Sequence, residues 1–269
     1  MYKNSILDEL DELIKSEKTA EYKLPLRCGV DLGTANIVIA VVDADGKPVA
    51  GIVNESKVVK DGIVVDYVGA IKNLKKMKAE LEERLGTELI NAATAIPPGI
   101  LVKNAKGFVS VVEGAGFEVT NIVDEPTAAA TVIGIKDGAV VDIGGGTTGI
   151  SVLENGEVIF TADEPTGGTH MTLAVAGYYG VDKAEAEKMK KDRSHQSDIY
   201  SIVVPVVEKM STIVKGFLKD HPTDTVYVVG GASLFDDFEE TFNKVTGVEC
   251  IKAEKALLVT PYGIALNCK

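Results

Sequence analysis

The chain has no apolar run long enough to span a membrane and no beginning typical of an exported protein. Its first residues, MYKNSILDELDELIK, lack the basic start and the apolar centre of a signal peptide. The sequence therefore favours a cytoplasmic protein over a membrane-spanning or secreted one.

Cysteine is also scarce. The three cysteines, Cys28, Cys250 and Cys268, are odd in number and follow no metal-ligand spacing, so buried reduced thiols are expected. The three histidines are scattered along the chain. The sequence thus predicts neither a disulfide framework nor a centre of cysteine and histidine ligands.

Positive charge is in short supply as well. With 28 Lys and Arg against 40 Asp and Glu, the formal net charge is −12. Surfaces that bind nucleic acid or anionic membranes are built from Lys and Arg, so the composition argues against both as partners. A nucleotide would have to be held locally, by backbone groups and a bound cation.

The commoner glycine-rich phosphate loops are missing too. A dinucleotide fingerprint or a P-loop opens into a helix, and the P-loop also needs a Lys after its last glycine. Gly146 is followed instead by apolar residues around an Asn155-Gly156 turn, which is a strong hairpin signal.

The chain does contain a sequence pattern suited to binding phosphate, and this pattern occurs twice. Residues 28–51 (CGVDLGTANIVIAVVDADGKPVAG) predict a strand, a tight turn at 31–34 and a hairpin, and residues 139–162 (AVVDIGGGTTGISVLENGEVIFTA) repeat that pattern. Glycines let the backbone approach an anion, Thr hydroxyls and N–H groups donate to its oxygens, and an Asp at each strand end can hold a hydrated cation. Two such turns facing each other would clamp a nucleoside di- or triphosphate.

Each copy alone also has a plainer interpretation. Glycine-rich turns are common between strands, so the glycines from Gly144 to Gly149 could form only a flexible turn, and Asp31 only the end of a strand. The second occurrence of the same Asp-apolar-Gly opening, with the same hairpin behind it, favours the functional interpretation.

Length and pattern predict two α/β lobes. With 269 residues, 45% hydrophobic and 25% charged, the chain should form two modest domains, each with its own core. Residues 67–85 predict a helix stopped by Gly86, and residues 125–133 a helix with a proline in its first turn. We predict an N-terminal amphipathic helix extension over 1–24, lobe I over 25–135 and lobe II over 136–269.

Five ordered motifs resemble the actin-like ATPase superfamily, which includes DnaK-type chaperones, MreB-type bacterial actins, FtsA and PilM assembly proteins, and sugar and acetate kinases. The motifs are DLGTAN, ATAIPPG, EPTAAA, DIGGGTTG and VVGGAS, and the resemblance covers about residues 26–266. It implies two duplicated ribonuclease-H-like lobes around a nucleotide cleft, with reduced peripheral subdomains. Within the superfamily the chain is most similar to the EutJ family of chaperone-like proteins from bacterial ethanolamine-utilization operons.

The resemblance implies a set of site residues for ATP or ADP and Mg²⁺. Asp31 and Asp142 would hold the metal, mostly through water, and the predicted catalytic residues are Glu125, Asp31 and Thr147. Glu125 would orient the attacking water, since phosphoryl transfer needs an aligned nucleophile and neutralised charge. The predicted nucleotide-binding residues are Gly33, Thr34, Asn36, Gly144, Gly145, Gly146, Thr147, Thr148, Glu187, Lys190, Gly230, Gly231 and Ser233.

Two of these assignments have plain alternatives. Glu125 could be a helix cap or a first-turn acid favoured by the helix dipole, and Glu187 and Lys190 could be solvated residues on a helix surface. DnaK-type chaperones also place a lysine near the γ-phosphate. Lys57, Lys60 and Lys103 are candidates for that role, and the sequence does not choose among them. The shortened subdomain that would carry it implies a weak ATPase.

Three function classes remain open. The first is a chaperone-like conformational switch of an ethanolamine-utilization system that closes on Mg-ATP and acts on a protein partner. The second is an MreB- or FtsA-like filament or scaffold ATPase, which the fold does not separate from the first. The third is a small-molecule kinase, ranked lower because no inserted substrate domain is evident.

The N-terminal helix suggests where a partner would bind. Residues 5–15 place Ile6, Leu7, Leu10, Leu13 and Ile14 on one face of a helix. This face could pack on the chain's own domain, or it could dock a protein client or a component of a bacterial microcompartment, the setting that the EutJ resemblance implies.

Overall fold

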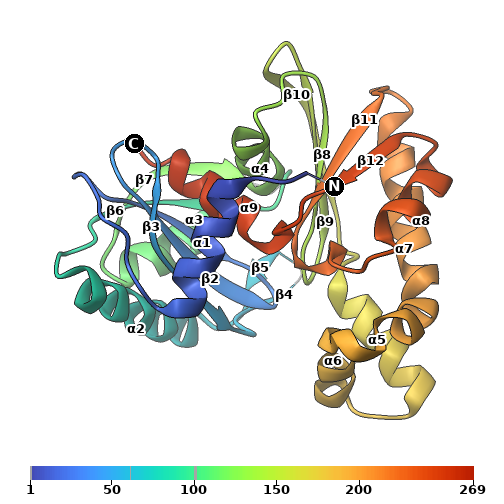
Figure 1. Ribbon diagram of the computed structural model, residues 1–269, viewed down its shortest axis with the longest axis horizontal. Coiled ribbons are helices and arrows are strands. Elements are labelled where there is room, and N and C mark those ends of the chain that lie inside the picture. The colour runs from blue at the N-terminus through green and yellow to red at the C-terminus, as the bar shows by residue number, and fades with distance from the viewer. Residues whose placement is uncertain (1, 61, 100–101) are drawn as a thin grey trace.

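The computed structural model describes residues 2–60, 62–99 and 102–269, which form two lobes standing side by side (Figure 1). Each lobe is built on one five-stranded sheet. The strands of the lobe I sheet lie within residues 27–124 and those of the lobe II sheet within residues 138–252.

The two sheets have the same strand order. It is β3-β2-β1-β6-β7 in lobe I and β10-β9-β8-β11-β12 in lobe II. In each, the first three strands pair antiparallel and the last two run parallel to the central strand. This duplication confirms the predicted α/β class. The strands are β1 Arg27–Leu32, β2 Asn36–Val42, β3 Pro48–Glu55, β6 Asn91–Ile96, β7 Glu118–Asp124, β8 Gly138–Ile143, β9 Thr148–Glu154, β10 Glu157–Glu164, β11 Thr225–Val229 and β12 Glu249–Lys252.

Local signals fix the element ends. Asn155 and Gly156, between β9 and β10, both have positive φ (55° and 83°), which a tight hairpin turn favours. Helix α2 (Tyr67–Leu85) begins at its cap Asp66 and ends at Gly86, whose φ of 67° is left-handed. Glycine adopts that conformation without the cost that a Cβ would add. The predicted helix over 67–85 is therefore confirmed.

The lobes differ in what they insert between their antiparallel and parallel strands. Lobe I carries a hairpin, β4 (Val59–Lys60) and β5 (Ile63–Val64), followed by α2. Lobe II carries three helices in the equivalent place, α5 (Gly168–Tyr179), α6 (Lys183–Lys191) and α7 (Gln196–Leu218). Two further helices lie between the parallel strands, α3 (Val102–Gly114) in lobe I and α8 (Phe238–Thr246) in lobe II.

Two helices cross between the lobes. Helix α4 (Glu125–Ile133) follows the last strand of lobe I and packs against β8 and β9 of lobe II, whereas α9 (Ala256–Leu266) follows the last strand of lobe II and packs against β1 and β2 (Figure 1). The two helices also pack tightly against each other. A Cβ added at Gly263 of α9 would lie 2.0 Å from the carbonyl oxygen of Ala128 in α4.

The N-terminal helix lies on the body of the protein. Helix α1 (Ser5–Ser16) packs on β3, and its Leu7 and Leu10 are fully buried in a core shared with β2, α4, β8 and α9. Lys255, just before α9, pairs with Asp11 of α1 at 2.6 Å. Ahead of the helix, the amide of Tyr2 donates to the carbonyl of Lys252 in β12. The N-terminal segment thus contacts both lobes.

Candidate functional site

A cleft of about 350 Å³ lies between the lobes, and both phosphate turns line it. A Cβ added at Gly145 in the lobe II turn would lie 3.0 Å from the Cβ of Ala35 in the lobe I turn. The turns therefore face each other directly. The predicted site residues that line this cleft are Asp31, Gly33, Thr34, Asn36, Glu125, Asp142, Gly144, Gly145, Gly146, Thr147, Glu187, Lys190, Gly230 and Gly231.

Thr148 and Ser233, the other two predicted residues, are fully buried and do not line the cleft described by the structure. The Thr148 hydroxyl donates to the carbonyl of Thr166 at 2.6 Å, and the Ser233 hydroxyl donates to the carbonyl of Gly230 at 2.8 Å. Both hydroxyls thus hold the backbone that shapes the cleft. A direct side-chain contact with a nucleotide is not supported by this placement.

The two predicted metal ligands lie at equivalent positions in the lobes. Asp31 is near the end of β1 and Asp142 near the end of β8. Burial, and then the charge of Asp142, raise the pKa of Asp31 to about 7. Burial raises the pKa of Asp142 to about 6 even though the hydroxyl of Thr260 donates to it. Two carboxylates brought together in this way favour a cation between them.

Gly230 is required beside Asp142 for a steric reason. It follows β11 with a φ of 88°, and a Cβ there would lie 2.3 Å from the Asp142 Oδ1 atom. Glycine is thus the residue that allows this turn to approach the carboxylate. The turn that begins at Gly230, predicted to bind nucleotide, therefore lies directly against the predicted metal ligand Asp142.

Glu125 begins α4, but it is not the cap of that helix. The cap is Asp124, whose Oδ1 accepts from the amide of Thr127 and from the hydroxyl of Ser151. Glu125 lines the cleft, where burial and the charges of Asp142 and Asp31 raise its pKa well above the usual range. The structure thus removes the capping alternative. It shows Glu125 as an acid in the first turn of α4 whose carboxylate also feels the charges of the two aspartates.

Glu187 and Lys190 are not a solvated pair on an exposed surface. Lys190 Nζ lies 2.7 Å from Glu187, and it donates to the Gly168 carbonyl and to the Thr172 hydroxyl at 3.0 and 2.8 Å. Burial lowers the pKa of Lys190, and the charge of Glu187 opposes that effect. Both side chains line the cleft and join α6 to the first turn of α5.

The first turn of α5 supports the lobe II phosphate turn. The amides of Gly168 and Thr169 donate to the carbonyls of Gly144 and Gly145 at 2.9 and 2.8 Å. These two amides are used to hold the adjacent turn in position.

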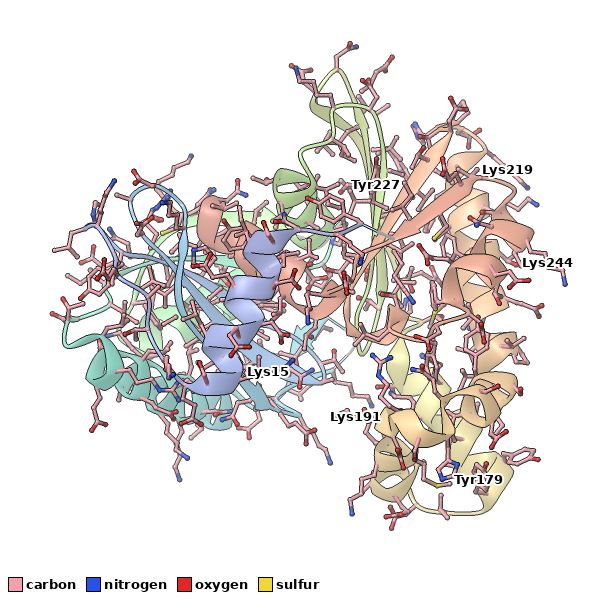
Figure 2. All side chains as sticks on the ribbon, viewed as in Figure 1. Lys15, Tyr179, Lys191, Lys219, Tyr227 and Lys244 are labelled. Carbon is pink, nitrogen blue, oxygen red and sulfur yellow. The ribbon has the colours of Figure 1, made fainter. Side chains whose placement is uncertain are left out.

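One ion pair joins the two lobes across the mouth of the cleft. Lys191 at the end of α6 lies 2.6 Å from Glu55 at the end of β3, and Figure 2 shows Lys191 on the side of α6 that faces lobe I. Glu55 pairs in the sheet with Asn36, next to the lobe I turn. The pair therefore connects elements adjacent to both halves of the site.

The candidate lysines for the γ-phosphate are not in the cleft lining as far as the structure describes it. Lys57 and Lys60 are exposed, and the side chain of Lys103 lies outside the described residues. Among the described lining residues, the cationic ones all come from lobe II. They are Lys190, Lys191 and Arg193.

Sequence reasoning missed several residues of the site. Thr260, which holds Asp142, immediately precedes the Pro261-Tyr262-Gly263 segment, but nothing local indicates that it contacts β8. Arg193 and Gln196 follow the Lys-rich end of α6 and line the cleft. Asp163 lies near the end of β10, where it pairs with Gly149 of β9. It follows directly after the repeated unit at residues 139–162, and that position was the signal available in the sequence.

Family models and known proteins match this chain in agreement with its fold. The model for MreB/Mbl protein matches residues 46–192, and the model for type IV pilus assembly protein PilM matches residues 128–259. The ethanolamine utilization protein EutJ of Escherichia coli K12 is 38% identical over 251 residues, covering 93% of this chain and 88% of that protein.

Solved structures agree with these matches. The crystal structure of EutJ from Carboxydothermus hydrogenoformans is 50% identical, covers 97% of each chain and has a TM-score of 0.92. The structure of MreB5 of Spiroplasma citri bound to ADP is 19% identical, has a TM-score of 0.71 and covers 88% of this chain and 94% of that one, which shows a shared fold. No helix in the described ranges is long and apolar enough to cross a bilayer.

Proposed function

The chain belongs to the EutJ family within the actin-like ATPase superfamily, and on that basis we propose that it is an ATP-binding, chaperone-like conformational switch of a bacterial ethanolamine-utilization system. It closes on Mg-ATP, hydrolyses it slowly and acts on a protein partner. The observation that carries this proposal is the direct contact between the two phosphate turns at one cleft. The similarity to ethanolamine utilization proteins supports the metabolic setting.

The donor set at the cleft suits a hydrated Mg²⁺. The described residues contain no group of three or more His, Cys, Asp or Glu side chains that could hold a metal. The two facing carboxylates of Asp31 and Asp142 match Mg²⁺, which keeps several waters and binds through one or two carboxylates plus phosphate oxygens. When bound, the ion supplies charge neutralisation to the phosphates.

The chain's own residues would perform the remaining tasks. The amides of the two glycine-rich turns bind the phosphate oxygens, and Glu125 orients a water toward the terminal phosphate. The nucleoside part of the ligand is held by the residues of α6 that line the cleft, together with Gly230 and Gly231. ADP lacks the terminal phosphate that spans the turns, so it would hold the lobes together less tightly than ATP.

Closure of the lobes is what would convert binding into a signal. A ligand shifts a conformational equilibrium only if it binds one state better than the other. ATP contacts both turns only when the lobes are together, and the Lys191–Glu55 pair also forms across the closed mouth. The packed helices α4 and α9 are the elements about which the lobes would move.

The partner is proposed to be a protein client or a microcompartment component. The apolar face of α1 is an unsuitable docking surface, because Leu7 and Leu10 are buried in the chain's own core. The exposed face of residues 5–15 carries Asp8, Glu9 and Glu12. We propose that a partner using this helix contacts its acidic face.

A filament or scaffold role is the second candidate, because the MreB/Mbl model matches the chain across both lobes. Such a protein would polymerise when nucleotide is added. Light scattering with and without Mg-ATP distinguishes the two candidates. A rise that depends on nucleotide and on protein concentration would favour the filament.

Calorimetric titration with ATP and ADP in the presence of Mg²⁺ tests the site. We expect Asp142→Ala to weaken ATP binding by about 10- to 100-fold, because carboxylates that orient a hydrated metal carry effects of that size. Asp220→Ala, an exposed aspartate remote from the cleft, is the matched control and should bind like the wild type. Unchanged affinity in Asp142→Ala would place the nucleotide elsewhere.

A pull-down with ethanolamine-pathway proteins tests the switch. We expect recovery of a partner to differ between ATP and ADP, and Glu9→Lys with Glu12→Lys to reduce it if the acidic face of α1 is used. Equal recovery in both nucleotide states would contradict a switch even if ATP binds.

A further inference from the structure

We propose that Asp163 is a positioning residue for ATP hydrolysis: it holds the hydroxyl of Thr147 so that this oxygen, together with Glu125, receives the attacking water. The inference rests on the proposed function of the same cleft. It adds Asp163 of β10, which is not among the residues that line the cleft, and it specifies the predicted catalytic role of Thr147.

Strand register places Asp163 on the side of the sheet that faces lobe I. Asp163 of β10 lies directly opposite Gly149 of β9, and residues directly opposite in an antiparallel pair project to the same face. A Cβ added at Gly149 would lie 3.1 Å from Pro98 and 3.3 Å from Pro126. That face therefore points toward the start of α4, where Glu125 lies.

Because Gly149 has no side chain, the start of α4 can pack close to the sheet at this position. With a side chain there, the start of α4 would have to move away from the sheet, because the two prolines are already at contact distance. Asp163 instead brings a carboxylate to this face from the neighbouring strand. Its charge acts on Glu125 and raises the pKa of that group further.

The polar environment of Asp163 is incomplete. Its Oδ1 atom is buried and has no hydrogen-bond partner among the residues that the structure describes. A hydrogen bond from the Thr147 side chain favours the ionised form, while burial raises the pKa of the group to about 7. Burying a carboxylate oxygen without a partner costs free energy. A carboxylate used only for folding could instead turn to solvent from this edge strand, so the buried position needs another reason.

The hydroxyl of Thr147 has one proton and two lone pairs. When the proton is donated to Asp163, the oxygen can only accept a hydrogen bond in the cleft. It would then accept from a water and would not donate to a phosphate oxygen. Thr147 and Glu125 both line the cleft, so their oxygens would hold one water between them.

The reaction itself is ordinary hydrolysis. The water oxygen forms a bond to the γ-phosphorus, and the bond from that phosphorus to the oxygen bridging the β- and γ-phosphates breaks. ADP leaves with the bonding electron pair, and the proton of the water passes to Glu125 and then to solvent. Asp163 touches none of these atoms and acts through Thr147.

Steady-state hydrolysis and calorimetric ATP binding of the full chain, with Mg²⁺, test the proposal. We expect Asp163→Ala to lower kcat by about 10- to 100-fold, which is typical when a reacting group loses its alignment. ATP affinity should remain unchanged or become tighter, because one negative charge is removed and Thr147 becomes free to donate to phosphate. Asp163→Asn, which keeps an acceptor for the hydroxyl, should restore most of kcat.

Two further variants separate positioning from a folding effect. In a Thr147→Val background, Asp163→Ala should cause no additional loss of kcat, since the group it positions is gone. Glu164→Ala, an exposed neighbour on the same strand, should leave kcat and affinity unchanged.

Each contrary result has its own meaning. Loss of ATP affinity in Asp163→Ala together with the loss in Asp142→Ala would overturn the positioning role and make Asp163 part of the binding site. Unchanged kcat in Asp163→Ala would overturn it as well. A wild-type chain that binds ATP without hydrolysing it would also overturn it while leaving the nucleotide site intact, whereas failure of the wild type to bind ATP would instead refute the proposed function.

Discussion

The two lobes share a sheet but differ in what they add to the cleft. Each contributes an aspartate and a glycine-rich turn from equivalent strands, β1 in lobe I and β8 in lobe II. The described cationic residues of the lining come from lobe II, from the helical insertion that lobe I replaces with a hairpin and α2. Duplication thus accounts for the phosphate end of the cleft, while the unequal insertions account for the rest.

The largest effect on stability should come from α4 and α9, the two helices that cross between the lobes. Gly263→Val would place a side chain against the Ala128 carbonyl, 2.0 Å from the position of its Cβ, and separate α4 from α9. We expect the free energy of unfolding to fall by about 3 kcal/mol or more, the scale of a severe core clash. Urea denaturation measures it.

The control for that substitution is a glycine outside α4 and α9. Gly177 in α5 has no described atom within 4 Å of an added Cβ, so Gly177→Ala should stabilise by about 0.4–1 kcal/mol. Equal destabilisation by the two variants would show that α4 and α9 are not special contacts between the lobes.

The pH dependence of stability should reveal the two buried carboxylates of the cleft. Burial, and then the charge of Asp142, raise the pKa of Asp31 to about 7, and burial raises that of Asp142 to about 6, above the unfolded value of 3.8. Between those values the folded protein binds more protons, so its stability falls as pH rises through 4 to 7. We expect the free energy of unfolding without Mg²⁺ to be lower at pH 8 than at pH 5 by about 1 kcal/mol or more.

Adding Mg-ATP at pH 8 should reduce or reverse this loss of stability, because a cation compensates the two charges.

Asp43, which lies outside the cleft lining, provides a contrast. Backbone amides outweigh burial and lower its pKa, so it stays ionised throughout this window. A stability that is flat from pH 5 to pH 8 would mean that the pKa values of Asp31 and Asp142 are not raised in the folded protein.

Two neighbouring lysines of α6 should give smaller and unequal effects. Lys190→Met leaves Glu187 partly buried without its nearest cation and should destabilise by about 1–3 kcal/mol. Lys191→Met removes the exposed pair with Glu55 and a longer pair with Glu187, and it should change stability by less than about 1 kcal/mol. Small-angle scattering should show a larger radius for Lys191→Met, because the link between the lobes is lost. An unchanged radius would mean that this pair does not hold the mouth closed.

Sequence patterns predicted the parts of this molecule that short-range physics determines. Helix α2 ends at Gly86, the predicted stop, and α4 has the predicted proline in its first turn, and both helices were found at their observed bounds. The paired turns were predicted because each repeats an Asp, an apolar residue and a glycine before a hairpin.

Long-range contacts were not predictable in this way. Nothing near Thr260 indicates that its hydroxyl meets Asp142, and nothing near Ile14 indicates that α1 packs against Gly51 of β3. Thr148 and Ser233 belong to matching motifs, but strand and turn geometry point their hydroxyls at carbonyls. Motif membership fixes a residue's position along the backbone, and the direction of its side chain depends on the fold around it.

The crossing of α9 onto β1 and β2 also sets an order of events during synthesis. Strands β1 and β2 leave the ribosome early, but the helix that covers them is formed by residues 256–266, more than 200 residues later in the chain. Until then the face of the first sheet that α9 covers stays bare, and Tyr2 lacks the carbonyl of Lys252 that its amide needs. Translation that stops before this helix would release a product whose first sheet exposes apolar surface, so lobe I is completed only after the strands of lobe II have been made.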